Sequence, residues 1–154
     1  MLSPRPGTEI LMRASFVAIV MMFATLPASA DVAPPPPDPA EGAWYGSMRQ
    51  VNVDGEESYA MTLTLREGGG TSDYPKLHCG GELERLGTAS GGYIVYKESI
   101  TRGAFDGGKS NGCVDGVVIV HIENNKLVLG WFGAFDGDPI VATARLTRGQ
   151  FNSR

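Results

Sequence analysis

Apolar and polar residues alternate with a period of two along much of the segment from Gly42 to Arg148. In residues 59–66, for example, Tyr, Met and Leu occupy every second position, with Ala, Thr and Arg between them. Such alternation places one face of a β-strand in a core and the other in solvent. Since no part of this segment has the 3.6-residue period of an amphipathic helix, the sequence predicts an all-β fold.

Eight short strands follow from this pattern, joined by Gly-rich turns. We expect them near 43–49, 59–66, 72–77, 80–86, 92–101, 117–122, 126–132 and 140–147. Gly68–Gly70 predicts a turn, and Asn124–Asn125 predicts a tight hairpin because Asn tolerates positive φ. The strand spacing favours a small antiparallel eight-stranded barrel or sandwich over residues 42–148. It leaves open whether the interior is filled or holds one small ligand.

The first 30 residues have the pattern of a secretory signal peptide. Arg5 and Arg13 precede an apolar core at 14–26, and Ala28-Ser29-Ala30 supplies the small residues of a cleavage site. We therefore expect cleavage after Ala30, with Met12 as an alternative start, no membrane span after cleavage, and a periplasmic or secreted protein. Residues 31–41 contain four consecutive prolines and predict a disordered leader, and 149–154 predict a C-terminal tail.

Cys79 and Cys113 are the only cysteines. In a secreted chain this pair predicts a disulfide, which would contribute roughly 3–4 kcal/mol in the chain-entropy model. The pair lacks the C-x-x-C spacing of redox motifs. His78 and His121 could complete a zinc site with the cysteines, but the four residues lack zinc-ligand spacing. We therefore expect no metal.

Charge and motif content narrow the function. The chain has 13 Lys and Arg against 17 Asp and Glu, a net charge of −4, which does not favour nucleic-acid binding. It has no G-x-S-x-G, H-E-x-x-H or phosphate-binding loop, so we expect a non-enzymatic protein without catalytic residues or cofactor. Acidic residues in the Gly-containing loops lack EF-hand spacing and are attributed to turn chemistry; they are Asp106, Asp115, Asp136 and Asp138.

Glu98 is unusual because alternation places it on the same face as Ile94, Tyr96 and Ile100. A carboxylate on an apolar face must be paired, protonated or placed at a barrel rim. We expect the rim, with Arg102 or Arg145 as partner. The alternative is a polar anchor within a ligand cavity.

A five-residue segment, Gly-Ala-Phe-Asp-Gly, occurs at 103–107 and again at 133–137. Each copy follows a predicted strand. We interpret them as two similar turns in which Asp-Gly supplies positive φ and the Phe covers the barrel end, although an internal duplication is an alternative.

Two short motifs carry resemblances to known families. Gly42-Ala43-Trp44 resembles the Gly-x-Trp opening of lipocalin- and avidin-like barrels, which implies a barrel whose base is plugged by the Trp. Residues 90–103 resemble the periplasmic and membrane-bound C-type lysozyme inhibitors, small secreted β-barrels with a disulfide whose two loops enter the lysozyme cleft.

The second resemblance rests on a few positions. Ser90, Gly91 and Tyr96 match the family's Ser-Gly-Ser-Gly-Ala-Arg-Tyr loop, and Thr101 and Gly103 match its Tyr-x-x-x-Thr-Lys-Gly loop, with Arg102 in place of Lys. Positions 92–95 depart from the pattern, Tyr96 to Thr101 is one residue too long, and both motifs share Tyr96. The resemblance implies binding residues at Ser90, Gly91, Tyr96, Thr101 and Arg102.

Three functions remain open from the sequence. The first is a protein-binding module that inhibits a lysozyme or another secreted hydrolase, occluding its cleft with the 88–93 and 101–112 loops. The net negative charge of the domain would favour binding to a lysozyme with a basic surface. The second is a barrel that carries a small apolar ligand in a cavity flanked by Trp131 and Tyr96. The third is an envelope structural protein with no discrete site.

Overall fold

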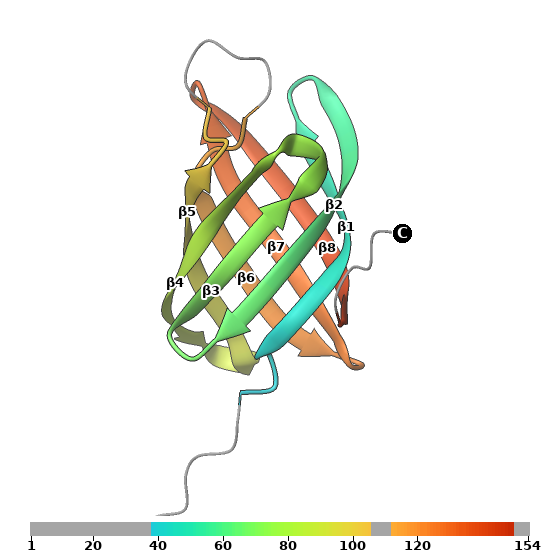
Figure 1. Cartoon of the computed structure of the whole chain (residues 1–154), viewed down its shortest axis with the longest axis vertical. Coiled ribbons are helices and arrows are strands. Elements are labelled where there is room, and N and C mark those ends of the chain that lie inside the picture. The colour runs from blue at the N-terminus through green and yellow to red at the C-terminus, as the bar shows by residue number, and fades with distance from the viewer. Residues whose placement is uncertain (1–37, 106–111, 150–154) are drawn as a thin grey trace, which may run out of the picture. The chain divides into compact units, whose positions relative to one another are not determined.

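The computed structural model describes residues 38–105 and 112–149, and its eight antiparallel strands form one closed barrel (Figure 1). Each strand pairs with the next, and β8 pairs with β1. This confirms the all-β prediction and selects the barrel over the sandwich. The predicted signal peptide, all but four residues of the leader, and the last five residues of the tail lie outside the described residues. The strands are β1 (Gly42–Asn52), β2 (Gly55–Arg66), β3 (Gly69–Tyr74), β4 (Cys79–Ala89), β5 (Tyr93–Arg102), β6 (Gly116–Glu123), β7 (Lys126–Phe135) and β8 (Asp138–Arg148).

Because the strands alternate in direction, the connections divide between two ends of the barrel. One end, here called the base, carries the turns at 67–68 and 124–125 and the short 3₁₀ segment η2 (Ser90–Gly92). The other end, the mouth, carries the turns at 53–54 and 136–137, the 3₁₀ segment η1 (Pro75–Leu77) and the connection from β5 to β6. The mouth is at the top in Figure 1.

Two hairpin turns follow the expected chemistry. Asn124 and Asn125 have φ of 49° and 61° between β6 and β7, which confirms the predicted tight hairpin. Asp136 and Gly137, in the second copy of the repeat, have φ of 50° and 89° between β7 and β8. Paired positive φ values match the right-handed twist of the flanking strands. The Asp-Gly of the first copy lies outside the described residues.

Two of the predicted boundaries near β3 are wrong. The strand expected at 72–77 runs from Gly69 to Tyr74, because Pro75 has no backbone N–H for the ladder and instead begins η1. The turn expected over three glycines spans only Glu67 and Gly68. Gly69 and Gly70 belong to β3, where their missing Cβ atoms let the backbones of β2 and β4 come close.

The interior of the base is filled. Trp44 is 1% exposed, donates its indole N–H to the Ala40 carbonyl at 2.8 Å and lies under the Arg148 guanidinium, 4.3 Å from the ring centroid. Arg148 also donates to the Pro39 carbonyl at 2.6 Å, so the segment before β1 is held across the base. Large apolar side chains from every second position pack above Trp44; they include Met61, Leu63, Leu65, Tyr96, Val118, Val120, Leu127, Leu129 and Leu146.

The disulfide predicted between Cys79 and Cys113 is present, with 6.1 Å between the Cα atoms. It joins the start of β4 to the connection between β5 and β6 at the mouth. The same connection is held by backbone bonds from Phe105 N–H to the Cys113 carbonyl (2.9 Å) and from Cys113 N–H to the Gly103 carbonyl (3.1 Å). Gly103 has φ of 64° and packs against the Cys79 backbone, so a side chain there would be obstructed.

Removing the disulfide should lower the free energy of unfolding but leave the strand pairing of the barrel intact. We expect the Cys79→Ser/Cys113→Ser double variant to lose roughly 3–4 kcal/mol, since the unfolded chain gains the entropy of an open loop of about 35 residues. Thermal unfolding followed by far-UV circular dichroism should show a fall in Tm of roughly 10 °C or more. The wild-type protein with added reductant is the control. An unchanged Tm in both would contradict a structural role for the bond.

Candidate functional site

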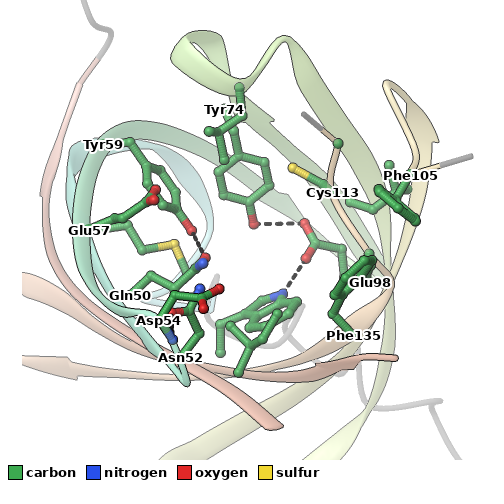
Figure 2. Close-up of a pocket in the computed structure, with 17 residues that line it drawn as sticks. Gln50, Asn52, Asp54, Glu57, Tyr59, Tyr74, Glu98, Phe105, Cys113 and Phe135 are labelled. Carbon is green, nitrogen blue, oxygen red and sulfur yellow. Dashed lines mark hydrogen bonds between the residues drawn. The ribbon is translucent and has the colours of Figure 1, made fainter. Parts of the chain in front are cut away.

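A cavity of about 300 Å³ opens at the mouth of the barrel (Figure 2). We call it the cup. Its floor is the packed base, and its walls combine aromatic, acidic and amide side chains. The residues that line it are Met48, Gln50, Asn52, Asp54, Glu57, Tyr59, Tyr74, Leu77, Glu98, Ile100, Phe105, Gly112, Cys113, Val114, Trp131, Phe135 and Ile140.

Glu98 lies inside this cup and not at the rim, so the expected pairing with Arg102 or Arg145 is wrong. Its side chain is 0% exposed. Arg102 instead pairs with Asp73, and Arg145 with Glu123, both on the outer surface. Alternation along β5 gave the correct face for Glu98, but it carries no information on depth or on which neighbours the closed sheet brings to it.

Three neutral donors surround the Glu98 carboxylate. Tyr74 donates its hydroxyl to Oε1 at 2.9 Å, and the indole N–H of Trp131 donates to Oε2 at 2.6 Å (Figure 2). The Ser72 hydroxyl also donates to Oε1. Ser72 in turn accepts from the Gly81 N–H at 3.2 Å, which leaves its own proton for Glu98. The donors come from β3 and β7, on either side of β5, so they meet Glu98 only across the barrel interior.

Two glycines make room for Trp131. Gly116 on β6 pairs with both Glu98 on β5 and Gly133 on β7, so the three lie in one row across the sheet. A Cβ at Gly116 or at Gly133 would overlap the indole ring. With both side chains absent, the ring lies flat over the row and its N–H reaches Glu98.

Tyr59 and Tyr74 form a second part of the wall. Their rings meet edge to face with centroids 6.0 Å apart, and the Tyr59 hydroxyl donates to Gln50 Oε1 at 2.6 Å. Burial, reinforced by the negative charge of Glu98, raises the pKa of Tyr59 to about 12 and that of Tyr74 well above its ordinary value of 10.0. Both phenols therefore remain neutral hydrogen-bond donors at any physiological pH.

The rim of the cup is aromatic on one side and acidic on the other. Phe105 and Phe135, from the two copies of the five-residue repeat, meet edge to face at 4.5 Å between centroids. This agrees with the expectation that they cover a barrel end. Asp54 and Glu57 are exposed on the β1–β2 hairpin opposite them. Asn52 accepts from the backbone N–H groups of Asp54 and Gly55, at 3.0 and 3.1 Å, and so fixes that hairpin.

The residues expected to bind a protein partner do not lie together. Ser90 and Gly91 are exposed in η2 at the base, whereas Thr101 and Arg102 end β5 at the mouth. The length of β5, a strand of 10 residues, therefore separates the two groups by roughly 30 Å. Tyr96 is 1% exposed in the filled part of the core, so its side chain offers no surface to a partner.

Neither histidine is among the residues that line the cup. His78 is exposed with φ of 55° beside the disulfide, and the His121 ring packs on Tyr93 at 4.5 Å between centroids. No group of three or more metal-ligating side chains occurs within 38–105 and 112–149. The same ranges contain no helix long and apolar enough to cross a membrane.

No protein-family model, curated protein or solved structure matches this chain. The cup therefore has to be interpreted from its own chemistry. Ser72, Tyr74 and Gln50 belong to the site but were not predicted there from the sequence. Alternation along 70–74 and 44–52 would have placed these polar side chains on the interior face, which was the available signal.

A substitution at Gly133 can test whether the space left by the two glycines positions the Trp131 indole. We expect Gly133→Ala to push the indole off the row, break its bond to Glu98 and cost about 1–3 kcal/mol of stability through overpacking. The indole N–H resonance of Trp131 in a ¹H–¹⁵N spectrum should move strongly. Gly130→Ala is the matched control on the same strand, because its Cβ would face the exposed Phe132 ring. Equal shifts of that resonance in the two variants would contradict the conclusion that the missing side chain of Gly133 positions the indole.

The raised pKa of Tyr59 predicts alkaline destabilisation. Between pH 10 and 12 the folded chain keeps a phenolic proton that the unfolded chain releases, so the free energy of unfolding falls as pH rises. The contribution of Tyr59 to the free energy of unfolding is complete below pH 10. Between pH 10 and 12 it falls by about 1.4 kcal/mol per pH unit. Denaturant unfolding of wild type and Tyr59→Phe across this range should show a shallower slope in the variant. Identical slopes would place Tyr59 at an ordinary pKa.

Proposed function

We propose that this protein binds a small organic molecule in the cup. The observation that carries the proposal is the cavity of about 300 Å³ at the mouth, closed below by the packed base. Eight-stranded barrels are wide enough to hold one small ligand, and ligand sites in proteins combine apolar walls with a few converging polar groups. The cup has both.

The chemistry of the walls differs from the apolar carrier considered from sequence. Trp131 does line the cup, but Tyr96 belongs to the filled base. Gln50, Tyr59, Tyr74 and Glu98 give the lower wall fixed polar groups. A ligand that fills this space would need polar atoms as well as an apolar body, since a purely apolar molecule would cover the solvent-accessible polar side chains of Gln50 and Asn52 without replacing their contacts with water.

The cup also has the features of a site that is formed before its ligand arrives. Its walls are strands of a closed sheet, and the disulfide with two backbone bonds holds the described part of the β5–β6 connection beside the opening. The buried polar side chains of the described residues are all hydrogen-bonded. Little ordering would therefore be needed on binding, which favours affinity for a small ligand.

Inhibition of a lysozyme or another secreted hydrolase stays a prediction from the sequence, as do secretion and a role without catalysis. The inhibitory mechanism expected there used two loops at once. Because Ser90 and Arg102 lie at opposite ends of β5, the expected contact residues do not form one surface. The ligand-binding proposal does not use them.

Blocking the cup should abolish ligand binding. A library of small organic molecules can be screened by ¹H–¹⁵N NMR, and we expect binders that shift the resonances of lining residues. Ile140→Trp places a large ring in the cup and should remove this binding. Val141→Trp, the next residue on β8, faces outward and should keep it. A screen whose binders all map outside the cup, or equal binding by the two variants, would contradict the proposal.

A further inference from the structure

We propose that the ligand of the cup is a small organic cation, an aromatic or aliphatic amine whose ammonium group contacts Glu98. This inference rests on the proposed function and names the chemical class of the ligand. Three independent features of the cup support it: the isolation of the Glu98 charge, the aromatic faces around it and the absence of basic residues from its described walls.

Glu98 is a buried carboxylate, and its hydrogen bonds within residues 38–105 and 112–149 come from neutral groups. Buried carboxylates in proteins are ordinarily paired with a cation or a metal. Among the described residues the arginine ion pairs lie elsewhere, on Asp38, Glu56, Asp73 and Glu123. A ligand ammonium group would supply the counter-charge that the described part of the chain does not.

The carboxylate also has room to accept one more donor. Oε1 accepts from Ser72 and Tyr74, while Oε2 accepts only from Trp131. An ionised carboxylate offers about four acceptor positions. Glu98 lines the cup but is 0% exposed, so a group inside the cavity reaches the remaining position on Oε2 only when the side chains that cover the carboxylate shift. A primary ammonium, with three N–H donors, can occupy it while it also reaches a neighbouring oxygen.

The aromatic side chains complement a cation in the same place. Tyr59, Tyr74 and Trp131 line the cup together with Glu98, and Tyr74 and Trp131 also donate to its carboxylate. The faces of such rings carry partial negative charge, and clusters of them recognise ammonium groups. Phe105 and Phe135 at the rim would contact the apolar body of the ligand, because they lie at the opening and have no polar atoms.

The charges of the lining exclude the opposite class of ligand. Asp54, Glu57 and Glu98 are acidic, and no Lys, Arg or His occurs among the described residues that line the cup. A cleft with charges of one sign concentrates counter-ions and repels like charge. Among the described lining residues, a carboxylate or phosphate ligand would meet three negative charges and no basic side chain, so fatty acids and phosphorylated molecules fit these walls poorly.

Three probes of one shape separate these possibilities. 2-Phenylethylamine, 2-phenylethanol and 3-phenylpropanoate share a phenyl ring and a short arm, and differ in charge at the end of the arm. We expect isothermal titration of the wild-type protein near pH 7 to rank them amine, alcohol, carboxylate. The amine should bind at least about tenfold more tightly than the alcohol, as a charge-assisted hydrogen bond to a buried carboxylate requires.

Glu98→Gln tests the assigned partner. It keeps the shape of the side chain and removes the charge, so the preference for the amine over the alcohol should fall to about twofold or less. Glu67→Gln is the matched control, because it removes one negative charge at the base, far from the cup, and should leave the tenfold preference intact. Circular dichroism establishes that both variants are folded. If Glu98→Gln does not fold, the order in which the wild-type protein binds the three probes still tests whether the ligand is a cation.

The failures of the two proposals are distinguishable. If the alcohol or the carboxylate binds in the cup as tightly as the amine, the cation assignment is overturned and ligand binding stands. If the preference survives in Glu98→Gln, the partner is another acid and the assignment to Glu98 is overturned. Absence of binding by all three probes overturns the amine class. Ligand binding itself fails only if the wider screen also finds no molecule in the cup.

Discussion

Pairing of β1 with β8 closes the sheet, and the rest of the molecule depends on that closure. Because the ladder from Trp44–Arg148 to Val51–Val141 joins the two ends of the described chain, the barrel has no free strand edge. Closure also gives the sheet an inner face that encloses the barrel interior and an outer face on the surface. Every second residue then faces all the others across a narrow space, and the size of those side chains decides where the space is filled.

The inside is filled unevenly along the barrel axis. At the base the inward positions carry Trp, Leu, Met and Val side chains that are 1% exposed or less. Toward the mouth the inward positions include Gly116 and Gly133. Their missing side chains leave room for the Trp131 indole, which lines the cup. One repeating pattern of strands thus produces a stabilising core at one end and a cavity with fixed polar walls at the other.

The features that depend on neighbours along the chain could be predicted from the sequence: the strands follow from period and the Asn124–Asn125 hairpin from local turn chemistry. The disulfide joins residues 34 apart, and it could be predicted only because the sequence has two cysteines and therefore one possible pairing. The site depends on pairing between strands far apart in sequence. Ser72 is 26 residues from Glu98 and Trp131 is 33. Without the register of β3, β5 and β7, nothing in the sequence places these side chains together, and Glu98 was therefore predicted at the rim with an arginine.

A structural role alone does not explain why Glu98 is acidic. An apolar residue of similar volume at this position would fill the same space without removing a charge from water, and replacing buried ionic groups by well-packed apolar ones is often neutral or stabilising. Keeping the carboxylate instead requires Ser72, Tyr74 and Trp131 to solvate it. Those three donors hold the charge at a fixed point in the wall of the cup and leave Oε2 with a single donor, Trp131. Such an arrangement preserves a negative charge for use by something that enters the cavity, which connects the least expected residue of the core to the proposed site.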